Sequence, residues 1–407
     1  MKTTTYLSNL TPLRGIAALL TVIFHIDLML GHGGNMLIKY KDSLVLSKMY
    51  LMVDFFFILS GFIMLHVYGK GFAEKVTKSE FKRFTIARFA RVYPLHLATL
   101  VYTVLLFAVS NSVGLSAEPI IQTENHGFSL FTNLFLLHSM NLHQWFSWNH
   151  ASWSISTEWW MYMVFPFLVL PFSKLGYWGK AIVALLCFVG YLSITVFIVP
   201  ILTVPDSLAF LRSAPAQPVI NVAYQFGFLR CLFGFVLGMM MYKGYQKEWG
   251  KSILANGYTI LALTLGFMIC MHFAVPDVFT VIFFPLILLS AAYGSKGMNV
   301  FLGSKPLQKL GDWSFSIYLT HQPLMFTISS IIAYQSLGQP KTAGPPPQPT
   351  MLMGWLICLA FIALTLVVSS FTYRFLEVPA RRWLNAQATS YSSDQMGVPS
   401  VVNSSKD

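Results

Sequence analysis

The chain has 407 residues, of which 55% are hydrophobic and only 10% are charged, whereas an ordinary soluble domain carries about 25% charged residues. This composition excludes an ordinary soluble domain and predicts an all-α, polytopic membrane protein. The formal net charge is +12, but the basic residues are scattered between apolar runs, so we expect membrane lipids as neighbours and no nucleic-acid partner. The four cysteines stand singly, without metal-ligand spacing, so neither a metal site nor a disulfide framework is expected.

About 20 apolar residues cross the hydrocarbon layer as a helix, and ten segments of the sequence meet this criterion. They are 12–31, 49–68, 93–111, 155–173, 181–200, 226–243, 253–273, 278–294, 314–335 and 351–373. A shorter apolar stretch, 128–138, is interpreted as a re-entrant piece. We expect one membrane-embedded domain over 1–385 and a disordered cytoplasmic tail over 386–407, which is rich in Ser, Asn and Gln.

The distribution of lysine and arginine predicts the orientation of these spans, because cytoplasmic loops carry an excess of both residues. With the N-terminus in the cytoplasm, 21 of the 27 lysines and arginines fall on the cytoplasmic side. Ten spans then leave both termini in the cytoplasm. The expected location is an inner (plasma) membrane, in a multi-pass arrangement.

The first span, RGIAALLTVIFH, opens on Arg14 and carries His25 eleven residues later. Eleven residues turn through about 1,100°, so both side chains lie on one helix face, roughly 16 Å apart along the axis. An arginine matches phosphate oxygens in fork geometry, and imidazole is the usual general base for an attacking hydroxyl. The pair suits a donor such as acyl-CoA, with phosphates at one end and a thioester at the other. The alternative is a structural histidine hydrogen-bonded to a neighbour.

The second and third spans add an acidic residue and two basic ones. Asp54, in YLMVDFFFILSGFIM, is expected to orient His25 or to bind acceptor hydroxyls, and the small residues of SGF at 60–62 allow close helix approach. Arg88 and Arg91, in IARFARVYP, are three residues apart and share a helix face. With Arg14 they are expected to form one phosphate clamp; plain anchoring at the cytoplasmic edge is the alternative.

The fourth span begins with ASWSISTEWWMYM, where Glu158 enters an aromatic helix without a nearby cation. An unpaired carboxylate is costly there unless it faces a polar cavity. We therefore expect Glu158 to orient a histidine or to bind an acceptor sugar, with Trp153 stacking on the ligand. The alternative is an interfacial aromatic belt with Glu158 facing water.

Two later spans carry further ionisable groups. Arg230, in FGFLRCLFG, is expected to pair with Asp54 or Glu158 or to hold an anionic acceptor, although it has the alternative of snorkelling to the interface. Tyr318 and His321, in LGDWSFSIYLTHQPL, are three residues apart on one face. They are expected to contact the donor, and for His321 a structural hydrogen bond is an equal alternative.

These motifs, in this order, resemble the acyltransferase 3 family of integral-membrane acyltransferases. The matching features are Arg14 and His25 with ten residues between them, VDFFFILSGF at 53–62, RFARVYP at 88–94, SWSISTEWW at 152–160, RCLFGFVLG at 230–238, LGDWSFSIYLTH at 310–321 and FLEVPARR at 375–382. The resemblance implies ten membrane helices, a cytoplasmic acyl-CoA donor and O-acylation of carbohydrate beyond the membrane. It also implies that His25, Arg14, Arg88 and Arg91 are essential.

The sequence therefore predicts an acyl-CoA-dependent O-acyltransferase without a metal cofactor, most simply an O-acetyltransferase using acetyl-CoA. The expected acceptor is a sugar hydroxyl of an exopolysaccharide, an O-antigen, another envelope glycan or its lipid-linked precursor. His25, Glu158 and Asp54 are the predicted catalytic residues, and direct transfer is favoured because no serine or cysteine stands in a nucleophile-elbow context. The alternative is a transporter or flippase for a lipid-linked saccharide, although no internal repeat supports it. The oligomeric state is left open.

Overall fold

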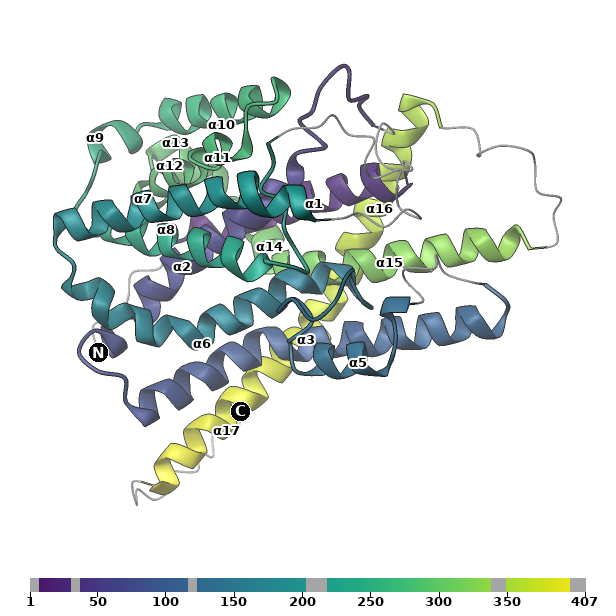
Figure 1. Ribbon diagram of the computed structural model, residues 1–407, viewed down its shortest axis with the longest axis horizontal. Coiled ribbons are helices and arrows are strands. Elements are labelled where there is room, and N and C mark those ends of the chain that lie inside the picture. The colour runs from purple at the N-terminus through teal and green to yellow at the C-terminus, as the bar shows by residue number, and fades with distance from the viewer. Residues whose placement is uncertain (1–6, 31–36, 116–122, 203–217, 338–348, 396–407) are drawn as a thin grey trace.

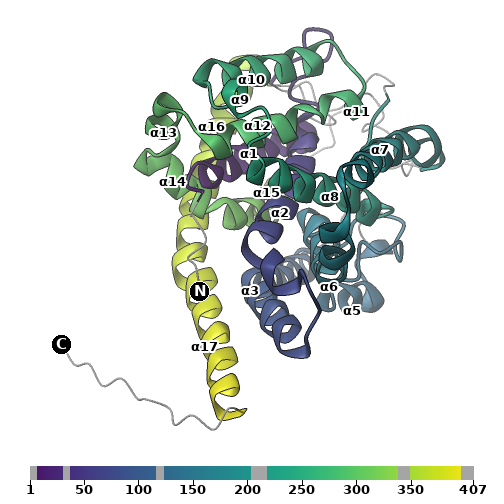
Figure 2. The same ribbon diagram turned by 90° about the vertical axis from the view of Figure 1, so that its left-hand side faces the viewer.

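The computed structural model describes residues 7–30, 37–115, 123–202, 218–337 and 349–395, and all regular structure in these ranges is helical. The prediction of an all-α protein is confirmed. Long helices lie side by side along the longest axis of the molecule (Figure 1), and Figure 2 views the same bundle from one end. The helices are α1 Leu10–His25, α2 Met52–Phe72, α3 Lys78–Ser112, α5 Gly127–Leu134, α6 Trp153–Lys174, α7 Tyr177–Ser193, α8 Gly227–Gln246, α9 Lys251–Leu254, α10 Gly257–His272, α11 Asp277–Thr280, α12 Phe283–Tyr293, α13 Lys296–Leu302, α14 Lys305–Asp312, α15 Ser314–Gln335, α16 Met351–Thr372 and α17 Val378–Gln395.

Each of the ten predicted membrane segments overlaps a helix, but not every helix has the length and composition of a membrane span. Five described helical segments do: Leu10–Leu28, Met49–Phe72, Lys78–Ser112, Tyr177–Ile201 and Met351–Gln387. A sixth arises if Asp277–Tyr293 and Lys296–Leu302, bent by 97° against each other, form one broken span. Helices α6, α8 and α15 have 20 to 22 residues but more polar sequences. The count of ten and the cytoplasmic termini remain predictions.

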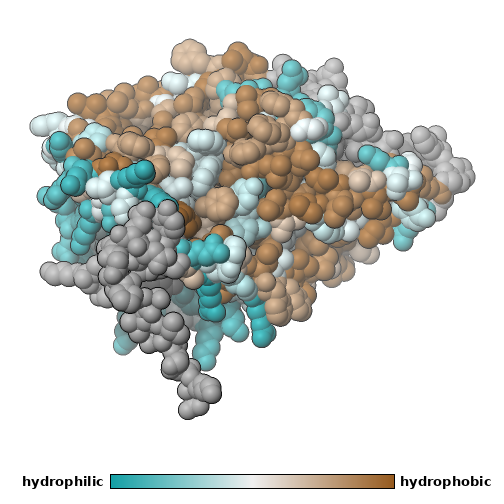
Figure 3. Space-filling model, turned by 90° about the horizontal axis from the view of Figure 1, so that it is seen from below, coloured by the Kyte–Doolittle hydropathy of each residue, from teal (hydrophilic) through white to brown (hydrophobic). Residues whose placement is uncertain are grey.

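The described surface carries the apolar side chains that a lipid environment requires. Figure 3 shows hydrophobic residues across most of one face, with hydrophilic residues gathered toward one end. Exposed aliphatic side chains project from three of the apolar helices: Val101, Leu105 and Val109 on α3, Ile182, Leu185 and Leu186 on α7, and Leu352, Leu356 and Leu359 on α16. Because patches of this extent are not found on soluble monomers, they indicate contact with lipid.

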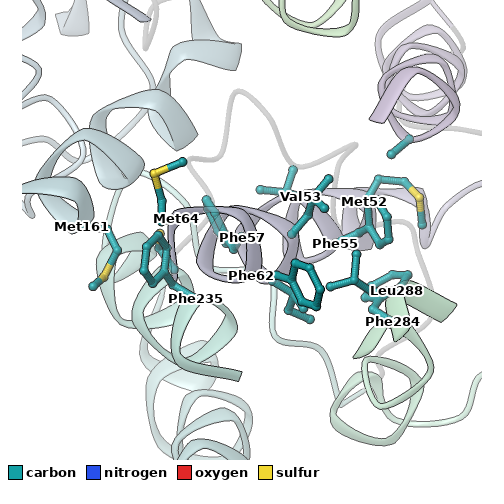
Figure 4. Packing of buried hydrophobic residues seen from close by; sticks show 14 of the residues in the cluster. Met52, Val53, Phe55, Phe57, Phe62, Met64, Met161, Phe235, Phe284 and Leu288 are labelled. Atoms are coloured by element: carbon teal, nitrogen blue, oxygen red, sulfur yellow. The ribbon is translucent and has the colours of Figure 1, made fainter. Parts of the chain in front are cut away.

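The centre of the bundle is the crossing of α2 and α8. Figure 4 shows side chains of α2, among them Phe57 and Met64, meeting Met161 of α6 and Phe235 of α8. A Cβ atom on Gly61 would lie 1.8 Å from the carbonyl oxygen of Phe235, and one on Gly238 would lie 1.8 Å from that of Ile58. The expected role of the SGF segment in close helix approach is therefore confirmed, because only glycine fits at this crossing.

The C-terminal region departs from the sequence prediction in one respect. After α16, a π-helical turn at Tyr373–Glu377 leads into α17, which continues to Gln395 and extends away from the bundle (Figure 2). The predicted start of the tail at residue 386 thus falls inside a helix. Residues 396–407 lie outside the described residues, so for them disorder remains a prediction.

The α2–α8 crossing yields a stability prediction. Gly238→Ala should destabilise the protein by about 1–3 kcal/mol, the usual cost of overpacking, because the new methyl group must push α8 away from Ile58. The readout is the thermal unfolding midpoint of the purified protein in detergent. The matched control is Gly297→Ala, since a Cβ at Gly297 meets no atom within 4 Å. Equal midpoints for the two variants would contradict the inferred close packing.

Candidate active site

A cavity of about 130 Å³ lies where α1, α2, α3, α6 and α15 meet. Four charged side chains line it, namely Arg14, Arg88, Arg91 and Glu158, and Tyr318 is also in its wall. These five residues come from four helices that are far apart in the sequence. The fold thus brings together the three predicted phosphate-binding arginines, one predicted catalytic carboxylate and one predicted donor contact.

Arg14 is positioned by a close contact between α1 and α14. A Cβ on Gly15 would lie 2.6 Å from the backbone nitrogen of Gly311, and one on Gly311 would lie 2.1 Å from the carbonyl oxygen of Thr11. This contact holds the start of α1 against the α14–α15 junction, where Ser314 begins α15 and lines the cavity. Arg14 itself makes no hydrogen bond or ion pair with any described residue. Its guanidinium donors are therefore available to a ligand.

Arg88 lies on α3, a single 35-residue helix whose N-cap Thr77 accepts a hydrogen bond from the backbone of Glu80. One of its terminal nitrogens donates to the Tyr68 hydroxyl at 2.9 Å, and its guanidinium lies over the rings of Tyr68 and Tyr162 at 5.1 and 5.8 Å. Its Nε is buried without a hydrogen-bond partner. An unpaired buried donor is costly, so this nitrogen also favours an anionic ligand in the cavity.

Arg91 differs from the other two arginines because it is already paired. It forms an ion pair with Glu377, whose second oxygen accepts a hydrogen bond from Ser316 Oγ at 3.0 Å. Glu377 is buried and sits in the π-helical turn that joins α16 to α17, and such turns are frequent at functional sites. The sequence analysis matched FLEVPARR but gave this glutamate no role. Its isolated position after a long apolar segment was the available signal.

Glu158 faces the cavity from α6 and is held by two hydroxyl groups. Ser60 Oγ and Tyr162 Oη each donate a hydrogen bond to its Oε1 at 2.5 Å, and Ser60 Oγ lies 3.1 Å from Tyr162 Oη. Oε2 makes no hydrogen bond with the described residues. The expectation that Glu158 faces a polar cavity agrees with this geometry, whereas no contact joins it to a histidine. Sequence reasoning missed Ser60 and Tyr162, although Tyr162 follows Glu158 at the i+4 spacing of one helix face.

His25, at the end of α1, has a tautomer that its neighbours determine. Its Nδ1 lies 2.9 Å from the carbonyl oxygen of Thr21, which can only accept, so Nδ1 carries the proton. The same Nδ1 lies 3.2 Å from Nε2 of the buried His321, and because Nδ1 carries the proton, this Nε2 is a second acceptor. Nε2 of His25 makes no hydrogen bond with the described residues and is not buried. His25 thus presents an unprotonated ring nitrogen.

Tyr318 connects the cavity with the two histidines. Its hydroxyl lies 2.8 Å from Ser154 Oγ at the cavity wall, and its ring centroid is 5.9 Å from that of His321. His321 and His25 have ring centroids 4.9 Å apart. The arginines of the cavity, Tyr318 and the two histidines therefore follow one another in space through the bundle.

Asp54 and Arg230 lie elsewhere, in a buried ion pair with both side chains fully inaccessible. Nε and one terminal nitrogen of Arg230 donate to the two Asp54 oxygens at 3.0 and 2.6 Å. The remaining donors reach Asn221 Oδ1, the Val222 carbonyl and the Tyr50 carbonyl at 3.1 to 3.2 Å. All five N–H groups of the guanidinium are thus used, and none is left for a ligand. Of the alternatives considered for Arg230, pairing with Asp54 is the one observed.

The contacts of Asp54 and Trp153 differ from those expected from the sequence. Asp54 is occupied by Arg230 and does not orient His25, whose neighbours are Thr21 and His321. Trp153 is buried, with the Arg230 guanidinium 5.7 Å from its ring centre, and it does not line the cavity. Both corrections have the same physical reason. The buried charge of Arg230 needs a partner and shielding from solvent; Asp54 supplies the partner and Trp153 contributes to the shielding.

Comparison with known proteins identifies the family of the chain. The profile of an acyltransferase domain family, Acyl_transf_3, matches residues 8–374. The chain belongs to the acyltransferase 3 family. It therefore is an acyltransferase by family, and its several long apolar helices make it a multi-pass membrane protein.

Curated relatives in this family have related names. The acyltransferase MdmB of Streptomyces mycarofaciens is 26% identical over 356 residues, covering 82% of this chain and 81% of MdmB. The peptidoglycan O-acetyltransferase OatA of Listeria monocytogenes is 22% identical over 413 residues, and OatA of Staphylococcus aureus is 23% identical over 394. Both matches cover 93% of this chain but only 56% and 57% of the OatA proteins, so the chain spans little more than half their length. No solved structure matches the chain significantly.

The contrast between the paired Arg230 and Arg14 can be tested by measuring how each substitution changes the free energy of unfolding. Arg230→Met should destabilise the protein by about 3–5 kcal/mol because it leaves Asp54 buried and unpaired. Arg14→Met should leave stability unchanged or slightly raise it, since Arg14 has no hydrogen-bond or ion-pair partner among the residues that the structure describes. Thermal unfolding of both purified variants in the same detergent decides between them. A larger loss for Arg14→Met than for Arg230→Met would contradict the assignment.

Proposed function

We propose that the protein is an acyl-CoA-dependent O-acyltransferase of the bacterial inner membrane, which transfers an acyl group from a cytoplasmic donor to a sugar hydroxyl. The proposal rests on a row of polar side chains in space, which extends from Arg14 and Arg88 through Tyr318 to His25. It provides cationic donors at one end and a neutral ring nitrogen at the other, as the two ends of an acyl-CoA molecule require.

The charge balance of the cavity favours a phosphate-bearing donor. Arg91 is neutralised by Glu377, while Arg14 has no partner within the described part of the chain and Arg88 keeps an unused buried donor. Anionic oxygens satisfy such donors better than neutral groups do. A volume of about 130 Å³ cannot contain a whole nucleotide, so the adenosine moiety remains at the mouth of the cavity while the thioester arm extends past Tyr318. Glu158 Oε2 accepts a hydrogen bond from this arm, whose amides are donors.

The proposed reaction uses His25 as the general base. Nε2 takes the proton from the sugar hydroxyl as its oxygen attacks the thioester carbonyl, and the C–S bond then breaks. The coenzyme A thiolate leaves and is protonated by the imidazolium of His25, which restores the base. The Nδ1–H bond to Thr21 fixes the tautomer needed for this step. His321 is a positioning residue for His25.

The names of the relatives guide the choice of group and acceptor. The OatA proteins are named as O-acetyltransferases, one of them acting on peptidoglycan, and MdmB is named as an acyltransferase. We infer acetyl as the transferred group and an envelope glycan, an exopolysaccharide or a lipid-linked precursor as the acceptor.

Transfer activity is the direct test. Membranes containing the protein should incorporate label from radiolabelled acetyl-CoA into the glycan fraction. His25→Gln, which keeps a donor for Thr21 but has no basic nitrogen, should reduce incorporation by at least about 100-fold, the lower end of general-base contributions. His272→Gln, at an exposed histidine on α10, is the matched control and should retain activity.

The outcomes separate the candidate functions. Equal incorporation by wild type and His25→Gln, at matched expression, would show that His25 is structural and that the mechanism is wrong. Absence of incorporation in all samples, together with movement of a lipid-linked saccharide across the membrane, would replace the enzyme by a transporter.

A second prediction concerns the donor site. Arg14→Lys keeps the charge but removes the planar fork that holds two phosphate oxygens at once. It should raise the KM for acetyl-CoA about tenfold while changing kcat little. A fall in kcat at unchanged KM would place Arg14 at the reacting atoms instead of at the phosphates.

A further inference from the structure

Three side chains outside the cavity form a cluster that the proposed reaction does not use. Glu124, His126 and His143 place one potential ligand atom each within 4.8 Å of one another. Glu124 and His143 are buried, and His126 lies at the solvent-exposed edge as the N-cap of α5. They belong to the segment between α3 and α6, at the end of the bundle predicted to be extracytoplasmic.

The hydrogen bonds around His143 determine which of its nitrogens carries a proton. Thr132 Oγ1 donates its only hydrogen to the Ser129 carbonyl at 2.9 Å. His143 Nε2 lies 2.7 Å from the same Oγ1, so Nε2 must be the donor in that contact. Nδ1 of the neutral ring therefore carries a lone pair. Fixing a ligand histidine through its other nitrogen is the usual arrangement around a protein-bound metal.

This lone pair faces a carboxylate oxygen. Glu124 Oε1 accepts a hydrogen bond from the Gln144 backbone N–H at 3.3 Å, and Oε2 lies 3.3 Å from His143 Nδ1. That separation is longer than a charge-assisted hydrogen bond of about 2.7–2.9 Å. It agrees with the edge of a tetrahedron of about 3.4 Å that results when nitrogen and oxygen bind one Zn²⁺ at about 2.1 Å each.

We propose that Glu124, His126 and His143 bind a divalent transition-metal ion of the zinc type. Two imidazole nitrogens and one carboxylate oxygen favour such an ion over Mg²⁺ or Ca²⁺, which prefer oxygen ligands. The ligand atom of the exposed His126 already lies within 4.8 Å of those of the buried pair, and water fills the fourth position. No sequence pattern indicates this site, because its ligands are separated by 1 and 16 residues and only the fold brings them together.

The metal has a structural consequence for the active site. His143 is tied to Gln225, whose side chain donates to its carbonyl oxygen at 3.1 Å. A few residues further on, Asn149 donates to the carbonyl of Leu319 on α15, two residues before His321. A metal at Glu124 thus holds the segment that leads into α6 and contacts the histidine-bearing part of α15.

Metal content and metal-dependent stability test the proposal on the full-length protein in detergent, with any affinity tag removed. Wild type dialysed against Zn²⁺ should retain about one ion per chain, and EDTA should lower its thermal unfolding midpoint by several degrees. Glu124→Gln should retain no Zn²⁺, and its midpoint should not respond to EDTA. This variant is not expected to unfold, because the new amide N–H donates to His143 Nδ1 while its oxygen still accepts from Gln144.

Two further variants complete the design. His126→Ala should weaken Zn²⁺ binding at least tenfold, whereas His272→Ala, which removes an exposed histidine from α10, should bind as wild type does. The proposal is overturned if wild type retains no Zn²⁺ above the level of Glu124→Gln, or if EDTA shifts the midpoints of both proteins equally.

Discussion

A charged group inside a bilayer is costly unless a partner, a hydrogen-bond network or water compensates it. This constraint distinguishes the arginines of this protein from one another. Arg230 has every donor satisfied by Asp54, the Asn221 side chain and backbone carbonyls, and Arg91 is paired with Glu377. Arg14 and Arg88 retain unused donors beside a cavity. The paired arginines stabilise the fold, and the other two carry the charge that the proposed anionic donor would compensate.

Close helix contacts place these groups. Gly61 and Gly238 let α2 and α8 cross at backbone distance, and Gly15 and Gly311 do the same for α1 and α14. The first crossing orders the centre of the bundle, and the second holds Arg14 beside the start of α15. Because association of helices in lipid depends on packing and not on water exclusion, small changes at these glycines should move the cavity walls.

Much of this arrangement is predictable from the sequence, for identifiable reasons. Apolar runs of helical length predicted the helices. Polar and ionisable residues in or beside these runs were predicted to be functional, and five of them line one cavity: Arg14, Arg88, Arg91, Glu158 and Tyr318. Pairing was harder to predict, because a charge in a span does not reveal which other helix faces it. Asp54 was therefore expected to orient His25 or to bind acceptor hydroxyls, and its observed pairing with Arg230 was only one of several alternatives for that arginine. Glu377 received no role. The Glu124–His126–His143 cluster depends on tertiary contacts with Thr132 and Gln144 that no spacing in the sequence indicates.

In the proposed mechanism, donor binding and proton transfer reside in separate residues, Arg14 on the cavity side and His25 beyond Tyr318. Equilibrium binding of radiolabelled acetyl-CoA to the purified protein in detergent, comparing wild type, Arg14→Gln and His25→Gln, separates the two roles. We expect saturable binding that Arg14→Gln weakens at least tenfold, or by about 1.4 kcal/mol, and that His25→Gln leaves unchanged. Binding by Arg14→Gln equal to that of wild type, or loss of binding in His25→Gln alone, would contradict it.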